Sequence, residues 1–314
     1  MNSTFYSNGK LLLTGEYAVL DGALSLAIPT KYGQLLTIKK NDTPKIIWTS
    51  LDEKGDTWFK ATLLIKSDDS TNSIRLEVEN KNNLDIDALS TAKTLINILT
   101  EAQKLNPFLS TTSGHFVETK LTFPRNWGLG SSSTLINNIA SWAKVDAYKL
   151  LWNAFSGSAY DIACAQHNYP ITYKLNQGKP EVSKTDFNPP FIDNLYFVYL
   201  NKKQNSRKGI ANYKSIAKDK TNLIAKISEL TQQMLTTESL TDFNSLILTH
   251  EKLLSSFLQT PTQKEALFSD FEGHIKSLGA WGGDFVLATG TPRQMRYFKR
   301  KGYLTLIPYK EMVL

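Results

Sequence analysis

One short stretch near the middle of the chain allows very few local structures. Residues 114–123 (GHFVETKLTF) alternate apolar and polar side chains, which predicts a half-buried strand. The segment PRNWGLGSSST at 124–134 follows, and after it Leu135, Ile139 and Trp142 recur at the spacing of one helix face. A strand that runs through a glycine-serine loop into a helix predicts a mixed α and β fold, with the loop at the start of the helix.

The glycine-serine loop has the composition of a phosphate-binding loop. Gly128 and Gly130 have no Cβ, so the backbone can turn tightly there and approach a ligand closely. Residues 131–134 (SSST) then begin the helix, whose first backbone N–H groups have no partner inside the helix and carry the positive end of its dipole. Such N–H groups bind phosphate, and a serine hydroxyl can also ligate magnesium. A serine N-cap after a glycine turn is the alternative, since the loop matches neither GxxxxGK[ST] nor GxGxxG.

Composition limits the class of protein. The chain has 314 residues, enough for one large domain or two ordinary ones, and 41% of them are hydrophobic, enough for a sizeable core. Its one cysteine, Cys164, excludes an internal disulfide framework and a multi-thiolate metal site, and we expect it to be a small buried apolar residue. The four histidines lack the HExxH spacing of metal hydrolases.

Charge and hydropathy bear on partners and location. The 36 Lys and Arg against 29 Asp and Glu give a net charge of +7, which fits an anionic small molecule as well as it fits nucleic acid. Because there is no arginine-rich arm, we expect no nucleic-acid partner. No apolar run approaches the ~18 residues that cross a bilayer, and the first ten residues lack the layout of a secretory signal. We therefore expect a cytoplasmic protein without a membrane partner, as a monomer or a homodimer.

Groups of strands and helices are predicted along the rest of the chain. Asn188-Pro189-Pro190 cannot propagate a helix and is the best candidate linker, so we expect two α+β domains that meet near residue 190. Strands are predicted at 32–39, 45–49, 56–66, 195–200, 279–289 and 303–308, and helices at 87–104, 206–236, 240–258, 263–277 and 292–301.

Further distinctive segments accompany the loop in a fixed order. They are GKLLLTGEYAVLDG at 9–22, GSAYDIACA at 157–165 and LGAWGGDFVLATG at 278–290. Together with PRNWGLGSSST, they resemble the signature segments of the GHMP kinases, a family of ATP-dependent small-molecule kinases. The first segment is most similar to the mevalonate and phosphomevalonate kinase branch. The middle one resembles a bacterial group of GHMP kinases with a G-Y-D-I-A string, although Ala159 replaces the glycine.

This resemblance implies a fold and an activity. The fold would be the two-domain α+β fold of GHMP kinases, with a nucleotide-binding, ribosomal S5 domain-2-like domain at 1–190 and a ferredoxin-like domain at 191–314. The activity would be that of an ATP- and Mg²⁺-dependent phosphotransferase, which transfers the γ-phosphate to a small acceptor. Mevalonate or phosphomevalonate, in isoprenoid synthesis, is the favoured acceptor.

The resemblance also implies catalytic roles. Lys10 would supply positive charge near the transferred phosphate, and Asp161 would accept or orient the proton of the acceptor hydroxyl. From the residues alone, Lys10 could instead be a solvated lysine at a strand edge and Asp161 a helix N-cap. The phosphates of ATP would lie on Gly128, Leu129, Gly130, Ser131, Ser132 and Ser133, with Ser132 also a ligand of Mg²⁺.

The acceptor would be contacted from the first and last segments. The residues implied are Glu16, Tyr17, Gly282 and Gly283, although Glu16 could equally be structural.

The sequence departs from the family pattern in a few places. Leu278 stands where a serine is usual, and Trp281 where a small residue is usual, so that an indole would narrow the pocket or stack on a neighbour. Residues 147–160 contain no acid that could hold magnesium, and Asp146 is the nearest. These departures favour an alternative function, that of a catalytically impaired nucleotide- or metabolite-binding homologue with another substrate.

Overall fold

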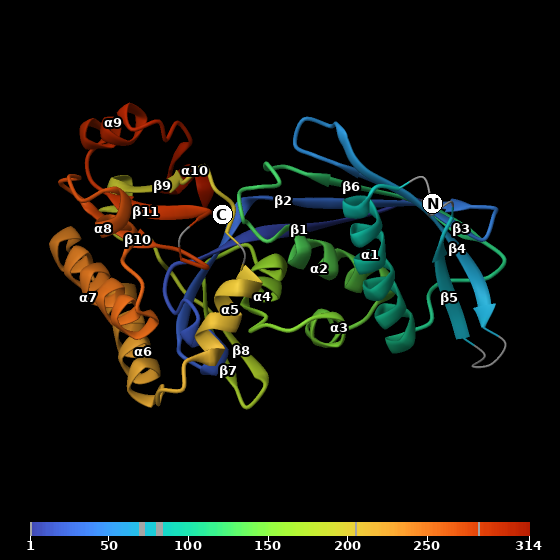
Figure 1. Cartoon of the computed structure of the whole chain (residues 1–314), viewed down its shortest axis with the longest axis horizontal. Coiled ribbons are helices and arrows are strands. Elements are labelled where there is room, and N and C mark those ends of the chain that lie inside the picture. Colours follow the sequence, from blue (N-terminus) through green and yellow to red (C-terminus); the bar gives the residue numbers. More distant parts are fainter. Residues whose placement is uncertain (1, 69–72, 80–83, 205, 282) are drawn as a thin grey trace. The chain divides into compact units, whose positions relative to one another are not determined.

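The chain forms two compact units, each built from separate stretches of sequence (Figure 1). The computed structural model describes residues 2–68, 73–79, 84–204, 206–281 and 283–314. The first unit consists of Met1–Gly9, Tyr32–Arg125 and Gly130–Gln166, and the second of Lys10–Lys31, Asn126–Leu129 and His167–Leu314.

The first unit contains a mixed sheet. Along this sheet the strand order is β5-β4-β3-β6-β2, and β1 also pairs with β2. Strands β3 and β6 run parallel, while β4 is antiparallel to both β3 and β5, and β2 is antiparallel to β6. The predicted strands of this region all overlap observed ones, so they are confirmed. The strands are β1 (Ser3–Leu12) and β2 (Ser25–Asn41), both of which continue into the second unit, β3 (Lys45–Leu51), β4 (Thr57–Asp68), β5 (Ser73–Val78) and β6 (Gly114–Leu121).

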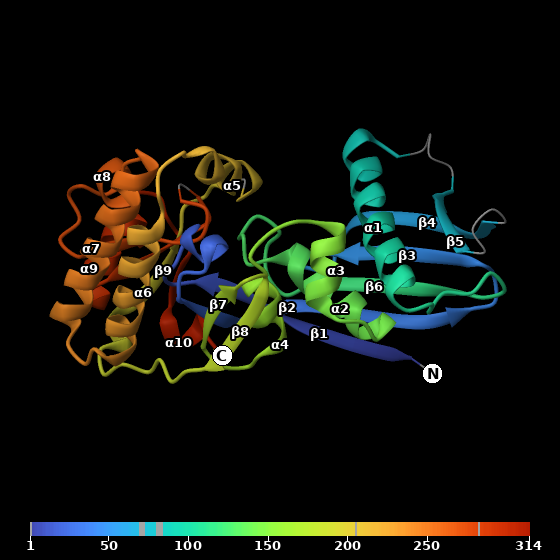
Figure 2. The same cartoon turned by 90° about the horizontal axis from the view of Figure 1, so that it is seen from below.

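Helices cover one face of this sheet. Figure 2 shows α1, α2 and α3 side by side on that face. Helix α1 begins after Asp85, whose carboxylate accepts a hydrogen bond from the Ala88 N–H, and it confirms the helix predicted at 87–104. The helices of this unit are α1 (Ile86–Leu105), α2 (Ser131–Ala143), α3 (Ala147–Ala154) and α4 (Tyr160–Gln166).

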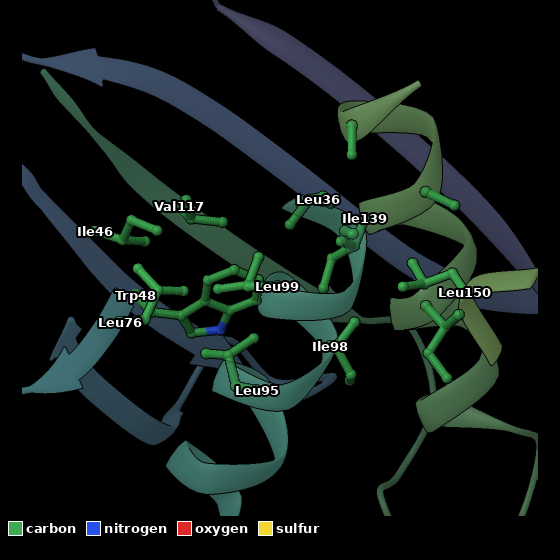
Figure 3. Packing of buried hydrophobic residues seen from close by; sticks show 14 of the residues in the cluster. Leu36, Ile46, Trp48, Leu76, Leu95, Ile98, Leu99, Val117, Ile139 and Leu150 are labelled. Carbon is green, nitrogen blue, oxygen red and sulfur yellow. The ribbon is translucent and has the colours of Figure 1, made fainter. Parts of the chain in front are cut away.

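The core of the first unit is packed around Trp48. Alternate residues of β3 are buried, which directs the Trp48 indole toward α1, where Figure 3 shows it beside Leu95 and Leu99. The indole N–H donates to the Ser50 hydroxyl at 3.0 Å, so this buried donor is satisfied. Cys164 is fully buried, as predicted.

The second unit contains two sets of strands. Strand β7 (Ile171–Asn176) pairs with the first residues of β2 and with β8 (Lys179–Lys184). Gln177 and Gly178, which join β7 to β8, both have positive φ (49° and 77°), the conformation that a tight two-residue hairpin requires. The other set is the antiparallel sheet β10-β11-β9-β12, with β9 (Leu195–Tyr199), β10 (His274–Ser277), β11 (Phe285–Thr289) and β12 (Leu306–Pro308).

This second sheet has a recognisable topology. In chain order the elements run strand, helices, strand, strand, helix, strand, and the first strand, β9, lies between the third and the fourth. That connection and order are those of a ferredoxin-like domain. Among the described residues, no helix has both the length and the apolar composition needed to cross a bilayer. The helices are α5 (Ser206–Ser215), α6 (Thr221–Thr236), α7 (Leu240–Leu258), α8 (Gln263–Leu267), α9 (Pro292–Arg300) and α10 (Tyr309–Met312), with short 3₁₀ turns at Ala18–Asp21 and Ile192–Asn194.

The helix predicted at 263–277 is wrong over most of its length. Helix α8 ends at Leu267, and residues 274–277 form β10. Phe268, Phe271 and Ile275 are spaced as on a helix face, and all of them are buried, but they reach the core from a loop and a strand. The backbone at Gly273 approaches β11 so closely that a Cβ on it would lie 2.2 Å from the Thr289 carbonyl oxygen, and the residues that follow pair with β11 instead of continuing a helix.

Other predicted ends are also corrected. The strand predicted at 279–289 begins only at Phe285, because Gly279, Trp281 and Asp284 have left-handed backbone conformations. The helix predicted at 206–236 is two helices, α5 and α6, and the strand predicted at 303–308 is shortened to β12. The remaining predictions, for the strand at 195–200 and the helices at 240–258 and 292–301, are confirmed. Asn188-Pro189-Pro190 lies inside the second unit, and a domain boundary at 190 stays a prediction.

Leu99 provides a test of the first core. It is fully buried beside Trp48, so Leu99→Ala should leave a cavity and lower the free energy of unfolding by about 2–5 kcal/mol. Urea unfolding followed by tryptophan fluorescence measures this loss. As a matched control, Leu304→Ala removes the same atoms from a side chain that is 73% exposed and should change stability by less than about 0.5 kcal/mol. Equal losses in the two variants would contradict this packing.

Candidate functional site

The glycine-serine loop has the backbone that the sequence predicted. Gly128 and Gly130 adopt φ of 68° and 90°, a region that side-chain-bearing residues rarely enter. Asn126–Leu129 belong to the second unit, and the residues from Gly130 onward belong to the first.

In the first unit, helix α2 starts without a side-chain cap. Its N-cap is Gly130 in the left-handed conformation, and the first helical hydrogen bond runs from the Thr134 N–H to the Gly130 carbonyl at 3.0 Å. The alternative of a serine N-cap is therefore not realised. Helices α1, α3 and α7 are capped by aspartate or serine side chains. The start of α2 thus presents backbone N–H groups that no capping side chain occupies.

Asp161 lies beside the loop serines. It is in the first turn of α4, after Ala159, whose φ is 66°, so it is not the N-cap. The Ser133 hydroxyl donates to Asp161 Oδ2, and the Ile162 N–H donates to Asp161 Oδ1 at 3.2 Å. The structure thus joins two predicted site residues, Ser133 and Asp161, in one hydrogen-bonded pair. Ser132 is exposed next to them.

In the second unit, Lys10 is bound to the first half of the loop. Its backbone N–H donates to the Leu129 carbonyl at 3.0 Å, and its ammonium donates to the Gly128 carbonyl at 2.9 Å. Lys10 is half-buried near the end of β1, so it is not a solvated lysine at a strand edge. Because Lys10 belongs to the second unit and Asp161 to the first, their meeting at a substrate stays a prediction.

Asp284 is a residue of this region to which sequence analysis assigned no role. A Cβ built on Gly128 would lie 2.2 Å from the Asp284 carboxyl carbon, so this carboxyl packs directly on the loop glycine. Burial raises the pKa of Asp284, while the Gln204 N–H and the nearby ammonium groups of Lys10 and Lys203 lower it. Its place in the string GGD was visible in the sequence, but its contact with a residue 156 positions earlier (284 − 128) was not.

Glu16 belongs to a fully buried charged cluster in the second unit. The Lys276 ammonium, 1% exposed, lies 2.6 Å from Glu16 Oε1 and 3.7 Å from Glu251 Oε1. It also donates to the Ser277 carbonyl at 3.0 Å, and the Ser277 hydroxyl donates to Glu251 Oε2 at 2.7 Å. Glu16 is 0% exposed, which favours the structural interpretation over a direct contact with a substrate.

Electrostatics of this cluster are set by burial. Burial raises the pKa of Glu16 to about 7 and also raises that of Glu251, and Lys276 opposes both shifts. Burial and the Lys276 charge hold the pKa of His250 well below its usual range. His250 Nε2 accepts the Gly15 N–H at 3.3 Å, so this ring nitrogen carries no proton. The 3.4 Å contact between Nε2 and Glu16 Oε2 is therefore not an ion pair.

Tyr17 and Trp281 pack together in the second unit. The Tyr17 ring stacks on Tyr213 with centroids 5.5 Å apart, and its hydroxyl donates to the Ala280 carbonyl at 2.8 Å. Trp281 is 4% exposed in the same apolar cluster, so its indole is a core residue that packs on its neighbours. Leu278 is also buried, at 2% exposed.

The acceptor contacts stay predictions. Tyr17 is 8% exposed, and Gly283 approaches the Lys202 carbonyl so closely that a Cβ on it would lie 2.8 Å away. Gly282 lies outside the described residues.

The donor set for a metal is sparse. Among the described residues, no group of three or more His, Cys, Asp or Glu side chains is arranged to hold a metal ion. The Asp146 carboxylate accepts hydrogen bonds from the Tyr148 and Lys149 N–H groups and so caps α3. The exposed Ser132 hydroxyl fits an ion that takes most of its ligands from phosphate oxygens and water, as Mg²⁺ does.

Lys276 provides a test of the buried cluster. Lys276→Met should lower the free energy of unfolding by about 3–5 kcal/mol near pH 7, because it removes the cation of two buried carboxyls. Without that cation, the folded-state pKa of Glu16 and Glu251 rises further above the unfolded value of about 4.3. Such a carboxyl stabilises the fold below the unfolded pKa, and this contribution is lost as pH rises toward the folded pKa. The loss measured by urea unfolding should therefore be smaller at pH 4 than at pH 8.

A matched control is Lys104→Met. Lys104 pairs with Glu101 at 2.8 Å, but its side chain is 65% exposed, and exposed pairs contribute only about 0–1 kcal/mol. Its substitution should change stability little at either pH. A pH-independent loss in Lys276→Met would contradict the assignment of the cluster charges.

Comparison with known proteins supports the fold. No protein-family model matches the chain, and no curated protein matches it in sequence. Solved structures do match. The Methanococcus jannaschii mevalonate kinase matches with 17% identity and a TM-score of 0.65 over 96% of this chain and 94% of that one. The Streptococcus pneumoniae phosphomevalonate kinase, in complex with phosphomevalonate and AMPPNP, matches with 16% identity and a TM-score of 0.66 over 97% and 99%. The Lactococcus lactis galactokinase, complexed with galactose, matches with 14% identity and a TM-score of 0.64 over 98% and 94%.

The likeness therefore extends over nearly the whole length of the chain, well beyond the short segments on which the resemblance was first based. The chain has the two-domain α+β fold of the GHMP kinases, which confirms the predicted fold class.

Proposed function

We propose that this chain is an ATP-dependent small-molecule kinase of the GHMP family. The observation that carries the proposal is the uncapped start of α2, which directly follows two left-handed glycines. Each unit adds one reactive group bonded to this loop: Lys10 to Gly128 in the second unit and Asp161 to Ser133 in the first. A cation, a carboxylate and free helix-start amides are the groups that phosphoryl transfer needs.

The loop would bind the phosphates of ATP. The backbone N–H groups at the start of α2 would donate to β- and γ-phosphate oxygens, and the helix dipole favours their negative charge. The missing side chain at Gly130 lets the phosphates approach the backbone. The residues proposed for this contact are Gly128, Leu129, Gly130, Ser131, Ser132 and Ser133.

Magnesium would be held chiefly by the nucleotide. Ser132 would supply a hydroxyl, while water and phosphate oxygens would complete the shell. When bound, Mg²⁺ neutralises the phosphate charge that builds up during transfer.

Lys10 and Asp161 would act at the transferred phosphate. An acceptor hydroxyl oxygen attacks the γ-phosphorus, and the bond from that phosphorus to the β,γ-bridging oxygen breaks, with its electron pair leaving on ADP. The hydroxyl proton goes to the Asp161 carboxylate, and the Lys10 ammonium neutralises charge on the γ-phosphate oxygens. A phosphate acceptor attacks with an oxygen that is already ionised, so it would depend less on Asp161 as a base.

Mevalonate and phosphomevalonate are the proposed acceptors, in isoprenoid synthesis. The support is the first sequence segment at 9–22 and the likeness to mevalonate and phosphomevalonate kinase structures. Glu16, Tyr17 and Gly283 would support or contact this acceptor. A cytoplasmic location and a monomeric or homodimeric state also stay predictions.

A binding protein with impaired catalysis is the second candidate. The lack of a metal-binding group of acids among the described residues favours it. The departures from the family pattern at Leu278 and Trp281 do not favour it, because both side chains are buried in packing positions.

One pair of measurements separates the two candidates. Isothermal titration with ATP measures binding, and a coupled ADP-release assay measures turnover with mevalonate, phosphomevalonate, galactose and homoserine. We expect magnesium-dependent ADP release with one of the first two. ATP binding without turnover for any of these acceptors would favour the binding protein. No ATP binding at all would exclude the kinase and leave, for the second candidate, only a protein that binds another metabolite.

Asp161→Asn tests the proposed base. The amide keeps the size of the side chain and can still bond to Ser133, but it cannot take a proton. We expect turnover of a hydroxyl acceptor to fall by at least about 100-fold with the ATP dissociation constant unchanged. Asp193→Asn, at an exposed ion pair with Lys310, is the control and should retain full activity. Near-normal turnover of a hydroxyl acceptor by Asp161→Asn would remove Asp161 from the mechanism.

A further inference from the structure

Asp284 is held in place by its backbone and by its side chain. Its N–H donates to the Lys202 carbonyl at 2.7 Å, and its carbonyl accepts the Leu200 N–H at 2.8 Å. The carboxylate Oδ1 accepts the Gln204 N–H at 3.0 Å. Its φ of 56° is in the left-handed region, which aspartate and asparagine tolerate better than most residues. The carboxylate therefore has a fixed position.

That position brings a negative group against the loop glycine that Lys10 also contacts. The carboxyl carbon of Asp284 occupies the space that a Cβ of Gly128 would need, at 2.2 Å. On the same residue, the Gly128 carbonyl accepts the Lys10 ammonium at 2.9 Å. Gly128 thus carries a cation and an anion as direct neighbours, all within the second unit.

The Asp284 carboxylate beside Gly128 is unfavourable unless another group compensates for its charge. It would repel an anionic ligand on the loop, and its burial has an energetic cost unless a cation balances its charge. The charged and titratable groups that act on it are Lys10 and Lys203, and burial together with its charge raises the pKa of Tyr199. Lys10 is bonded to the loop through the Gly128 carbonyl.

We propose that Asp284 is a positioning residue, whose carboxylate fixes the Lys10 ammonium at Gly128 and so directs it toward the γ-phosphate. The inference rests on the proposed kinase function, because it assigns Lys10 the role of neutralising the transferred phosphate. Asp284 itself does not touch the reacting atoms. It balances and orients a cation that would otherwise sample several rotamers of a long side chain.

The kinetic test uses Asp284→Asn. Asparagine keeps the shape, tolerates the left-handed backbone and can still accept the Gln204 N–H, so only the charge is lost. We expect kcat to fall by about 10- to 100-fold, as for other losses of positioning, with the KM for ATP and the apparent KM for Mg²⁺ within twofold of wild type. Lys203→Met removes the other neighbouring cation and is the control, with kcat near wild type. A kcat that high magnesium restores would make Asp284 a metal ligand and overturn the proposal.

A second test does not depend on catalysis. In protein labelled with ¹³C at aspartate carboxyls, the Asp284 signal, assigned by its absence in Asp284→Asn, gives its pKa by NMR titration without nucleotide. Lys10→Met should raise the pKa of Asp284, because the cation bonded to Gly128 is gone, and should do so more than Lys203→Met. An Asp284 pKa that Lys10→Met leaves unchanged would overturn the proposal whatever the kinetics. If the pKa shifts while wild type phosphorylates no acceptor, the pairing stands and the proposed function fails.

Discussion

The ion pair between Glu16 and Lys276 is the constraint on which the second unit depends. These residues are 260 positions apart in the sequence and both are fully buried, so an ammonium without carboxylates there would be very costly. The pair fixes the turn that follows β1 to the end of β10, directly before the glycine-rich segment at 278–284. Lys10, on β1, and Asp284, at the end of that segment, are therefore supported by the same buried charges.

What the sequence could predict was local. The glycines of the loop, the helix after it and the burial of Cys164 follow from backbone conformation, periodicity and composition, which act over a few residues. The segment around Phe268 and Ile275 shows where such reasoning fails. Its apolar spacing is that of a helix, but β11 pairs with it and draws residues 274–277 into a sheet, so tertiary pairing overrides the local pattern.

The site residues that sequence reasoning missed or misjudged owe their positions to long-range contacts. Lys276 appears in the sequence as an ordinary lysine before a glycine-rich segment, and only its burial between Glu16 and Glu251 reveals its role. The role of Asp284 likewise becomes evident only from its contact with Gly128. No periodicity or spacing encodes either contact. The sequence pattern singles out the segments, but it could not say which side chains within them face one another.

Trp281 shows how a residue that breaks a family pattern can still preserve the geometry of the site. A left-handed backbone (φ 42°) costs a bulky residue about 1–2 kcal/mol. Burial of the large apolar indole opposes this cost, while its buried N–H has no hydrogen-bond partner among the described residues. The Gln204 amide donates to the Trp281 carbonyl at 2.7 Å, and the Tyr17 hydroxyl donates to the Ala280 carbonyl. Because side chains from two other connecting segments hold these carbonyls, tertiary contacts impose the path of this segment. A small residue at position 281 is therefore not required to place Asp284 against Gly128.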